Sequence, residues 1–300
     1  MDYSDLGTSG IRVSRVGLGC NNFGSRIGAD ETRAVVEAAL EAGITFFDTA
    51  EVYGGGGGSE RLLGEILEDR RDSVVLATKF GWEPDRGRGS AGVVRSAIEG
   101  SLERLRTGYV DLYYLHKPDP ETPIAETLQA LGELVAEGKV RALGCSNFSA
   151  AQLAEANRVA DELGTPRFVA VQNEYSLLQR RDDADVLPLC SGLDVSYIPY
   201  FPLASGLLTG KYRRGEEAPD GTRLAGREIE DERLARVEAL ERFAAERGRT
   251  ILELAMGSLL STPGIASVIA GATKPEQVRA NVAAAGLRLG PEDLAALAAI

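Results

Sequence analysis

Four residues with side chains that can exchange protons occur where predicted β-strands end or just after them. Asp48 closes a β-type run of Ile, Thr and two Phe, and Tyr53 follows five residues later. Lys79 is one of only five lysines, and His116 is the only histidine of the chain. An ammonium beside a phenol favours the phenolate and lowers the pKa of the phenol. Such a phenol can exchange a proton with a carbonyl or alcohol oxygen, to which His116 could also hydrogen-bond.

Each of these residues alone also has an ordinary structural explanation. Asp48 could be a turn residue and Tyr53 a half-buried packing residue. Lys79 and Asp48 could form an ion pair without a chemical role, and His116 could be a packing histidine. The catalytic interpretation therefore depends on a fold that brings all four to one face.

Eight β-type segments alternate with helical patterns, which predicts an α/β fold of the (β/α)8 TIM-barrel class. The predicted strands are 16–19, 45–48, 74–78, 111–115, 140–145, 168–172, 195–200 and 267–270. The predicted helices between them are 30–42, 59–70, 91–106, 123–137, 149–163 and 183–191. An open dinucleotide-binding sheet is disfavoured, because Gly17-Leu18-Gly19 continues as Cys20-Asn21-Asn22 and lacks the G-x-G-x-x-G turn.

Three additions to the barrel are expected. The first fifteen residues predict an N-terminal β-hairpin. The interval 201–266 predicts a long loop and an extra helix between strands 7 and 8, and a long loop on a compact barrel is typical of a lid or binding loop. Thr250 and Glu253 have the spacing of a capping box at the start of the following helix. No change in composition marks a boundary, so residues 1–300 are expected to form a single domain.

Active sites of such barrels lie at the carboxyl ends of the strands. Polar side chains occupy most of these ends in the predicted barrel: Asp48, Lys79, His116, Ser146 with Asn147, Gln172 and Tyr200. A ring of polar residues around one mouth predicts a site there. The glycine run 54–58 is expected to let the loop with Tyr53 turn back before Ser59 caps the next helix.

Composition restricts the partners and the location. A formal charge of −12 argues against nucleic acid and anionic membrane surfaces as partners. No run approaches the ~18 to 20 apolar residues of a membrane helix, and the acidic first residues do not resemble a secretory signal, so a cytoplasmic protein is expected. The three cysteines lack metal-ligand spacing, and we expect neither a disulfide framework nor a metal site.

The sequence resembles the aldo-keto reductase family over nearly its whole length, in particular its short bacterial members and the reductase-like potassium-channel β-subunits. The segments with the family's catalytic residues are matched by Phe47-Asp48-Thr49-Ala50-x-x-Tyr53, Thr78-Lys79-Phe80 and Tyr114-Leu115-His116-Lys117-Pro118-Asp119. The cofactor-cleft segments are matched by Gly144-Cys145-Ser146-Asn147-Phe148, Val171-Gln172-Asn173-Glu174-Tyr175, Pro202-Leu203-x-Ser205-Gly206-Leu207-Leu208-Thr209-Gly210 and Gly271-Ala272-Thr273-Lys274-Pro275-Glu276-Gln277-Val278.

The resemblance implies NAD(P)H-dependent interconversion of carbonyl and alcohol, with the cofactor extended across the barrel mouth and supplying the hydride. Tyr53 would be the general acid in reduction, tuned by Lys79 and Asp48. His116 would orient the substrate carbonyl. The substrate would be a small aldehyde, ketone or sugar.

The resemblance also implies a set of cofactor-binding residues. Ser146, Asn147 and Gln172 would bind the nicotinamide carboxamide, and Tyr200 would stack on the ring. The full set implied is Gly19, Cys20, Asn21, Asp48, Ser146, Asn147, Gln172, Tyr200, Phe201, Pro202, Leu203, Ser205, Gly206, Leu208, Lys211, Gly271, Thr273, Lys274, Gln277 and Asn281.

The chain departs from many family members at both ends of the cofactor cleft. Phe201 stands where many have serine, which removes one polar contact. Gly271-Ala272 and Gln277 stand where many have a Lys-Ser pair and an arginine that bind the 2′-phosphate. Lys274 could meet this phosphate instead, or be a solvated residue at a helix start. We expect NADP, with NAD as the alternative.

The expected substrate pocket consists of Tyr53 and His116 with three aromatic residues, Phe23, Trp82 and Phe148, each of which could equally pack in the core. The chain runs only to Ile300, without the longer C-terminal loop of steroid-specific relatives, so an open pocket is expected. Two alternatives to a reductase remain: an aldose or alcohol dehydrogenase acting in the oxidative direction, and an NADPH-binding regulatory subunit with little turnover. The sequence leaves the substrate, the direction and the oligomeric state open.

Overall fold

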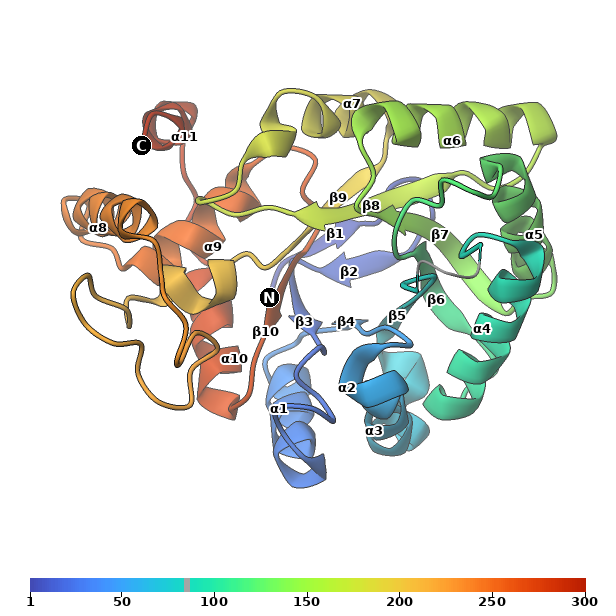
Figure 1. Ribbon diagram of the computed structural model, residues 1–300, viewed down its shortest axis with the longest axis horizontal. Coiled ribbons are helices and arrows are strands. Elements are labelled where there is room, and N and C mark those ends of the chain that lie inside the picture. Colours follow the sequence, from blue (N-terminus) through green and yellow to red (C-terminus); the bar gives the residue numbers. More distant parts are fainter. Residues whose placement is uncertain (84–86) are drawn as a thin grey trace.

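Eight parallel strands form the centre of the structure, a computed structural model that describes residues 1–83 and 87–300 (Figure 1). The strands are β3 (Val16–Gly19), β4 (Phe46–Asp48), β5 (Val75–Phe80), β6 (Val110–Leu115), β7 (Val140–Ser146), β8 (Phe168–Glu174), β9 (Ser196–Tyr200) and β10 (Val268–Gly271). They pair in the order β10-β3-β4-β5-β6-β7-β8-β9. The last gap is bridged where Tyr197 N donates to Gly264 O (2.9 Å) and Ala266 N donates to Tyr197 O (3.2 Å). The predicted (β/α)8 barrel is confirmed.

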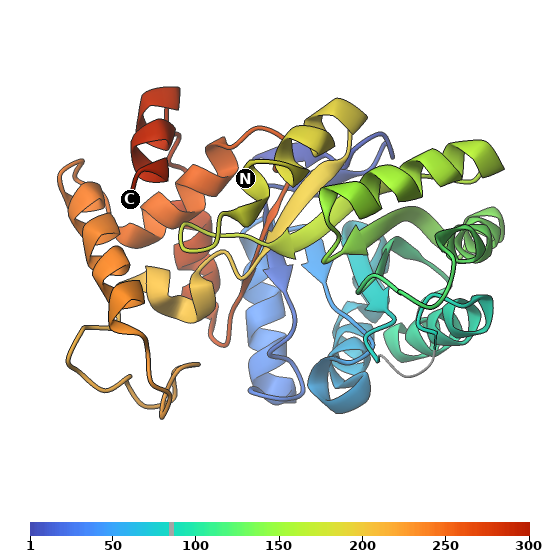
Figure 2. The ribbon, with the colours of Figure 1, turned by 45° about the horizontal axis from the view of Figure 1, so that its top comes forward.

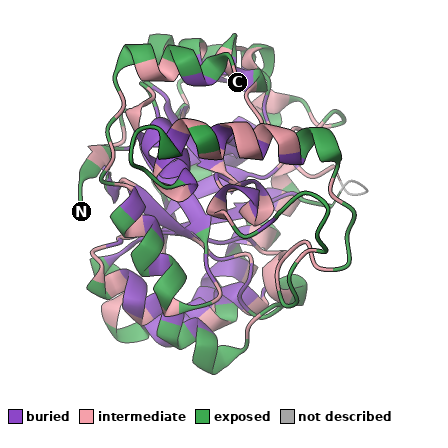
Figure 3. Cartoon of the chain, turned by 90° about the vertical axis from the view of Figure 1, so that its left-hand side faces the viewer, coloured by how far each residue is buried: buried purple, intermediate pink, exposed green. Residues whose placement is uncertain are grey.

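Helices follow the strands and surround the barrel. They are α1 (Ala29–Glu41), α2 (Tyr53–Gly56), α3 (Gly58–Leu67), α4 (Ala91–Leu105), α5 (Ile124–Ala136), α6 (Ala150–Leu163), α7 (Val186–Leu193), α8 (Asp231–Ala245), α9 (Ile251–Ser261), α10 (Pro275–Ala284) and α11 (Pro291–Ala298). Their apolar faces, such as Leu63, Val94 and Leu131, are buried against the strands, while the outer faces are exposed (Figure 3). No helix within residues 1–83 and 87–300 has the length and apolar character needed to cross a membrane.

Helix ends differ from the predictions at a few positions. The predicted helix 59–70 ends at Leu67 and continues as a 3₁₀ turn, η1 (Glu68–Ser73). The predicted helix 183–191 begins later, because the Asp185 side chain accepts from Val186 N and fixes the start there. Ser59 was expected to cap a helix, and this was wrong: it lies inside α3, and its hydroxyl donates to the Cys20 carbonyl (2.9 Å).

The predicted N-terminal hairpin closes the amino end of the barrel. Strands β1 (Tyr3–Asp5) and β2 (Arg12–Ser14) pair antiparallel. Leu6 and Val13 are fully buried in the cluster that fills the barrel, together with Tyr114. Gly7 N donates to Ser196 Oγ (2.8 Å) at the start of β9. The hairpin is therefore a plug at the end opposite to the polar strand ends.

The predicted long loop and extra helix between the seventh and eighth barrel strands are also present. After β9, a 3₁₀ segment η4 (Ala204–Thr209) leads into an irregular loop, followed by α8 and α9. The loop extends below α8 on the side of α9 and α10 (Figure 2). The capping box is confirmed, since Thr250 Oγ1 accepts from Glu253 N (3.2 Å) and Glu253 Oε2 accepts from Thr250 N (2.8 Å).

Candidate active site

The carboxyl ends of the barrel strands surround a cavity of about 860 Å³. Asp48 at the end of β4, Gln172 on β8, Tyr200 at the end of β9 and Gly271 at the end of β10 all line it. His116 follows β6 directly and lines it too. The parallel arrangement thus brings residues from distant parts of the sequence to one mouth.

A buried ion pair lies at the base of this cavity. Lys79 Nζ is 2.5 Å from Asp48 Oδ1 and donates to Thr49 O at 2.8 Å. Gln172 Nε2 donates to the other Asp48 oxygen at 2.8 Å. Burial lowers the pKa of Lys79, but Asp48 and Tyr53 outweigh it, so that the pKa lies above its ordinary value. Lys79 is therefore an ammonium whose charge is matched by Asp48.

Tyr53 lies above this pair, at the start of the short helix α2. The Lys79 nitrogen is 5.0 Å from the centre of the Tyr53 ring. Burial raises the pKa of Tyr53, and this outweighs the opposing effect of Lys79. The sequence predicted a lowered pKa, because it gave no measure of the burial. The phenol consequently stays protonated at neutral pH.

His116 faces Tyr53 across the cavity, with ring centres 6.0 Å apart and the rings nearly perpendicular. The Trp82 ring packs beside the His116 ring, with ring centres 4.7 Å apart. The pKa of His116 falls to about 2, chiefly through burial and further through the charges of Lys79, Lys117 and Arg88. The imidazole is neutral, so one of its nitrogens donates a hydrogen bond and the other accepts.

The end of β7 is joined to its neighbours by hydrogen bonds. Asn147 has a left-handed backbone (φ 62°), and its amide donates to the His116 carbonyl at 2.9 Å. Its side-chain oxygen accepts from the Tyr200 hydroxyl at 2.8 Å. Ser146 Oγ donates to the Gln172 carbonyl at 2.7 Å. This network fixes a row of amide and hydroxyl groups along one wall of the cavity.

The other half of the cavity has features of an anion site. Phe201, Ala204 and Ser205 have positive φ angles of 52°, 47° and 60°, a strained run that turns the chain along the wall. Lys211 and Lys274 line this half, and Lys274 is the N-cap of α10, whose N-terminus favours negative charge.

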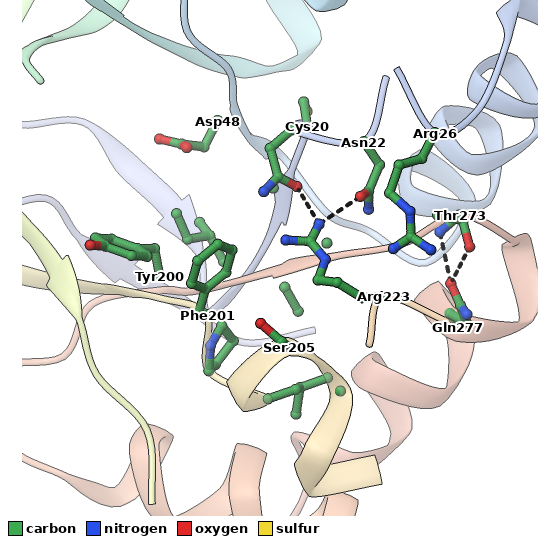
Figure 4. A pocket seen from close by; sticks show the side chains of 18 of the residues that line it. Cys20, Asn22, Arg26, Asp48, Tyr200, Phe201, Ser205, Arg223, Thr273 and Gln277 are labelled. Carbon is green, nitrogen blue, oxygen red and sulfur yellow. Dashed lines mark hydrogen bonds between the residues drawn. The ribbon is translucent and has the colours of Figure 1, made fainter. Parts of the chain in front are cut away.

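Glycine gives this half its width. A β-carbon on Gly271 would lie 3.2 Å from Asn22 Nδ2 and 3.4 Å from Asn21 Oδ1, which is tight contact at the cavity wall. Figure 4 shows the Thr273–Gln277 contact nearby, in which Gln277 Oε1 accepts from Thr273 N at 2.7 Å.

The loop after η4 crosses the cavity as a strap. Arg223 donates to Asn22 Oδ1 (2.7 Å) and to Asn21 Oδ1 (3.4 Å), as Figure 4 shows for Asn22. Its guanidinium lies 5.3 Å from the centre of the Phe201 ring. Arg26 reaches back and donates to Gly221 O at 3.1 Å. The strap thus joins the loop after β3 to the loop after β9.

Most of the predicted site residues line this one cavity. They are Gly19, Cys20, Asn21, Asp48, Tyr53, Trp82, His116, Ser146, Asn147, Gln172, Tyr200, Phe201, Pro202, Leu203, Ser205, Gly206, Lys211, Gly271, Thr273, Lys274, Gln277 and Asn281. Lys79 does not line the cavity: it is buried behind Asp48, with which it pairs.

Three predicted residues are buried in the core and do not line the cavity. Phe23 and Leu208 are fully buried. Phe148 packs edge-on against Phe168, with ring centres 5.9 Å apart. Of the two alternatives for Phe23 and Phe148, a place in the substrate pocket or packing in the core, the structure shows packing in the core. Trp82, by contrast, is 38% exposed and lines the cavity.

Several residues that line the cavity were not predicted from the sequence: Asn22, Arg26, Lys117, Asp220, Thr222, Arg223 and Leu252. Lys117 carried a signal, since it is one of five lysines and directly follows His116. Arg223 carried none beyond its place in a long loop.

Comparison with known proteins relates this geometry to a family. A sequence model described as "Aldo/keto reductase family" matches residues 15–300. A "Probable voltage-gated potassium channel subunit beta" of Oryza sativa subsp. japonica is 37% identical over 300 residues, covering 95% of this chain and 91% of that protein. "Aldo-keto reductase YhdN" of Bacillus subtilis (strain 168) is 36% identical, covering 98% and 91%. "Uncharacterized oxidoreductase YrpG" of the same organism is 36% identical, covering 98% and 94%.

Proposed function

The chain belongs to the aldo/keto reductase family, and on this premise we propose that it is an NADP-dependent oxidoreductase that reduces small aldehydes and ketones to alcohols. One observation carries the proposal. A partly buried phenol, a neutral imidazole and a charge-matched Lys79–Asp48 pair meet at one end of a cavity whose other end has cationic side chains and a helix N-terminus.

The cavity fits an extended dinucleotide. It reaches from Tyr53 and His116 to Lys274, the N-cap of α10, and to Asn281 within this helix, past a wall of amides and hydroxyls. Lys211, Lys274 and Arg223 supply positive charge for phosphate groups, while the protein as a whole is acidic. This excess of cations supports NADP, with its additional phosphate, over NAD. When bound, NADPH supplies the hydride.

The chain itself supplies the proton and holds the substrate. Tyr53 is placed to protonate the carbonyl oxygen as it gains negative charge. The neutral His116 donates a hydrogen bond to the same oxygen and fixes its position. The ammonium of Lys79, 5.0 Å from the Tyr53 ring, stabilises the phenolate left after the transfer.

The protonated state of Tyr53 suits the role of proton donor in reduction. A proton donor must be protonated, and burial keeps the phenol so at neutral pH. Oxidation of an alcohol would use the same phenol in the reverse role, as the proton acceptor. An aldose or alcohol dehydrogenase would therefore use the same residues.

A second candidate function follows from the plant relatives, which are named as probable potassium-channel β-subunits. An NADPH-binding regulatory subunit would use the same cavity with little turnover. The presence of all four catalytic groups favours the enzyme.

The decisive experiment measures NADPH consumption with nitrobenzaldehyde, methylglyoxal and short aldoses for the wild type and for Tyr53→Phe. We expect turnover by the wild type and a fall in kcat of roughly 100- to 10,000-fold in the variant, which keeps the ring but loses the proton. NADH in parallel reactions tests the choice of cofactor. Undiminished turnover by Tyr53→Phe would remove the proton-donor assignment, and tight NADPH binding without turnover would favour the regulatory subunit.

A further inference from the structure

Lys117 lies against Trp82 at the substrate end of the cavity. Its ammonium is 3.6 Å from the centre of the Trp82 ring, a close cation–π contact. Trp82 in turn packs beside His116, with ring centres 4.7 Å apart. Both residues line the cavity. A positive charge is therefore held beside the ring that would orient the substrate carbonyl.

This charge is separate from the catalytic pair. Lys79 is matched by Asp48, whose oxygen is 2.5 Å away. Within residues 1–83 and 87–300, by contrast, no carboxylate forms an ion pair with Lys117. Its field reaches the site, since Lys117 is one of the charges that lower the pKa of His116.

The cavity is cationic although the protein is acidic. Its lining includes Arg26, Lys211, Arg223 and Lys274 in addition to Lys117, against Asp48 and Asp220. Arg223 lies on the strap and Arg26, in the loop after β3, donates to it. Lys211 follows η4, and Lys274 is the N-cap of α10, so these four cations lie where phosphates would be held. Lys117, beside Trp82 and His116, is placed instead to meet the substrate.

We propose that Lys117 is a specificity-determining residue that selects carbonyl substrates carrying a carboxylate. The inference rests on the proposed reductase function and names a substrate class for it. Trp82, which is 38% exposed, offers apolar surface for the body of the substrate, and the ammonium beside it offers a charged partner for the carboxylate. The carbonyl then lies toward Tyr53 and His116.

The kinetic test compares para-formylbenzoate with its methyl ester, two aldehydes of similar shape that differ in charge. We expect the wild type to prefer the carboxylate, and Lys117→Met to lower the carboxylate-to-ester ratio of kcat/KM at least tenfold, about 1.4 kcal/mol, mainly through KM. Lys117→Arg should retain most of the preference. Lys139→Met is the matched control, because Lys139 precedes β7 at the other end of the barrel and pairs with Glu99 and Glu137.

A binding test separates this inference from the proposed function. Trp82 is the only tryptophan, so intrinsic tryptophan fluorescence reports on this position alone. We expect benzoate to change it at lower concentration than benzamide, and this difference to disappear in Lys117→Met. If no aldehyde is reduced but benzoate binding depends on Lys117, the reductase proposal fails and anion recognition stands.

Two results would overturn the inference. If Lys117→Met changes the kcat/KM of both aldehydes by the same factor, Lys117 only holds Trp82 in place. If the variant binds benzoate as the wild type does, the ammonium does not recognise the carboxylate.

Discussion

His116 is held as a neutral imidazole by burial and by the nearby cations, with a pKa of about 2. It is the only histidine, so its ring Cε1–H gives a single resonance in a histidine-labelled sample. We expect no titration of this resonance from about pH 5 to 8, where an ordinary histidine titrates. In the unfolded chain His116 takes up a proton as the pH falls below about 6.5, whereas in the folded chain it stays neutral down to about pH 2. The free energy of unfolding should therefore fall as the pH drops below about 6.5.

A titration midpoint of the His116 resonance between about pH 5 and 8 would contradict this and would point to a more solvated ring. Urea unfolding of the wild type and His116→Gln, measured across the same pH range, provides the control. The glutamine variant should lose the part of the pH dependence that comes from His116.

At the scale of single residues, positions could be predicted from the sequence but pKa values and the burial of side chains could not. The positions of Asp48, Lys79, Tyr53 and His116 at one mouth could be predicted, because the barrel rule places strand ends together. The direction of the Tyr53 pKa could not, because it depends on burial against an opposing charge, and neither quantity is visible in a sequence. Likewise, an aromatic residue near a strand end gives no indication of whether it packs inward, as Phe23 does, or faces the cavity, as Trp82 does.

Among the elements, the glycine turn after Tyr53 allows a matched test. Gly54 and Gly55 have nearly the same left-handed backbone, with φ of 71° and 73°. A β-carbon on Gly54 would lie 2.6 Å from Phe23 O and 2.7 Å from Ser59 N, whereas one on Gly55 meets nothing within 4 Å. We expect Gly55→Ala to lower the free energy of unfolding by about 1–2 kcal/mol, the cost of the left-handed backbone. Gly54→Ala should lower it by more.

The same pair should differ in activity. Gly54 directly follows Tyr53, so the collision in Gly54→Ala displaces the phenol and lowers kcat, while Gly55→Ala leaves the turn in place. Urea unfolding and aldehyde reduction measure the two effects. Equal losses of stability in the two variants would mean that the backbone angle alone, and not the close approach to Phe23, requires glycine here.

The strap shows which element contacts could not be predicted. The sequence indicated a long loop after the seventh barrel strand, and the structure has one. The contact of Arg223 with Asn22 joins residues 201 positions apart. No local pattern encodes such a contact, because it forms only when the strand ends have come together across the closed barrel.

In the molecule as a whole, the two ends of the barrel differ in structure: one holds a cavity and the other is filled by packed side chains. The carboxyl ends of the strands form the polar cavity, and the hairpin fills the amino end with apolar side chains. The order of strands and helices was predictable because their hydrophobic patterns are strong and regular. The cavity that we propose as the active site and the apolar plug thus lie at opposite ends of the same strands.

This separation predicts that the plug can be weakened without loss of function. Leu6 is fully buried among the side chains inside the barrel, so Leu6→Ala should lower the free energy of unfolding by about 2–5 kcal/mol through lost contacts and a cavity. Arg12→Ala on the same hairpin is the control, since Arg12 is exposed and its pair with Asp5 is weak, and it should change stability by no more than about 0.5 kcal/mol. Urea unfolding measures both, and kcat and KM of the folded variants should match those of the wild type. A change in KM in Leu6→Ala would show instead that the packing of the plug is transmitted along the strands to the mouth, and the two ends would then have to be treated as one unit.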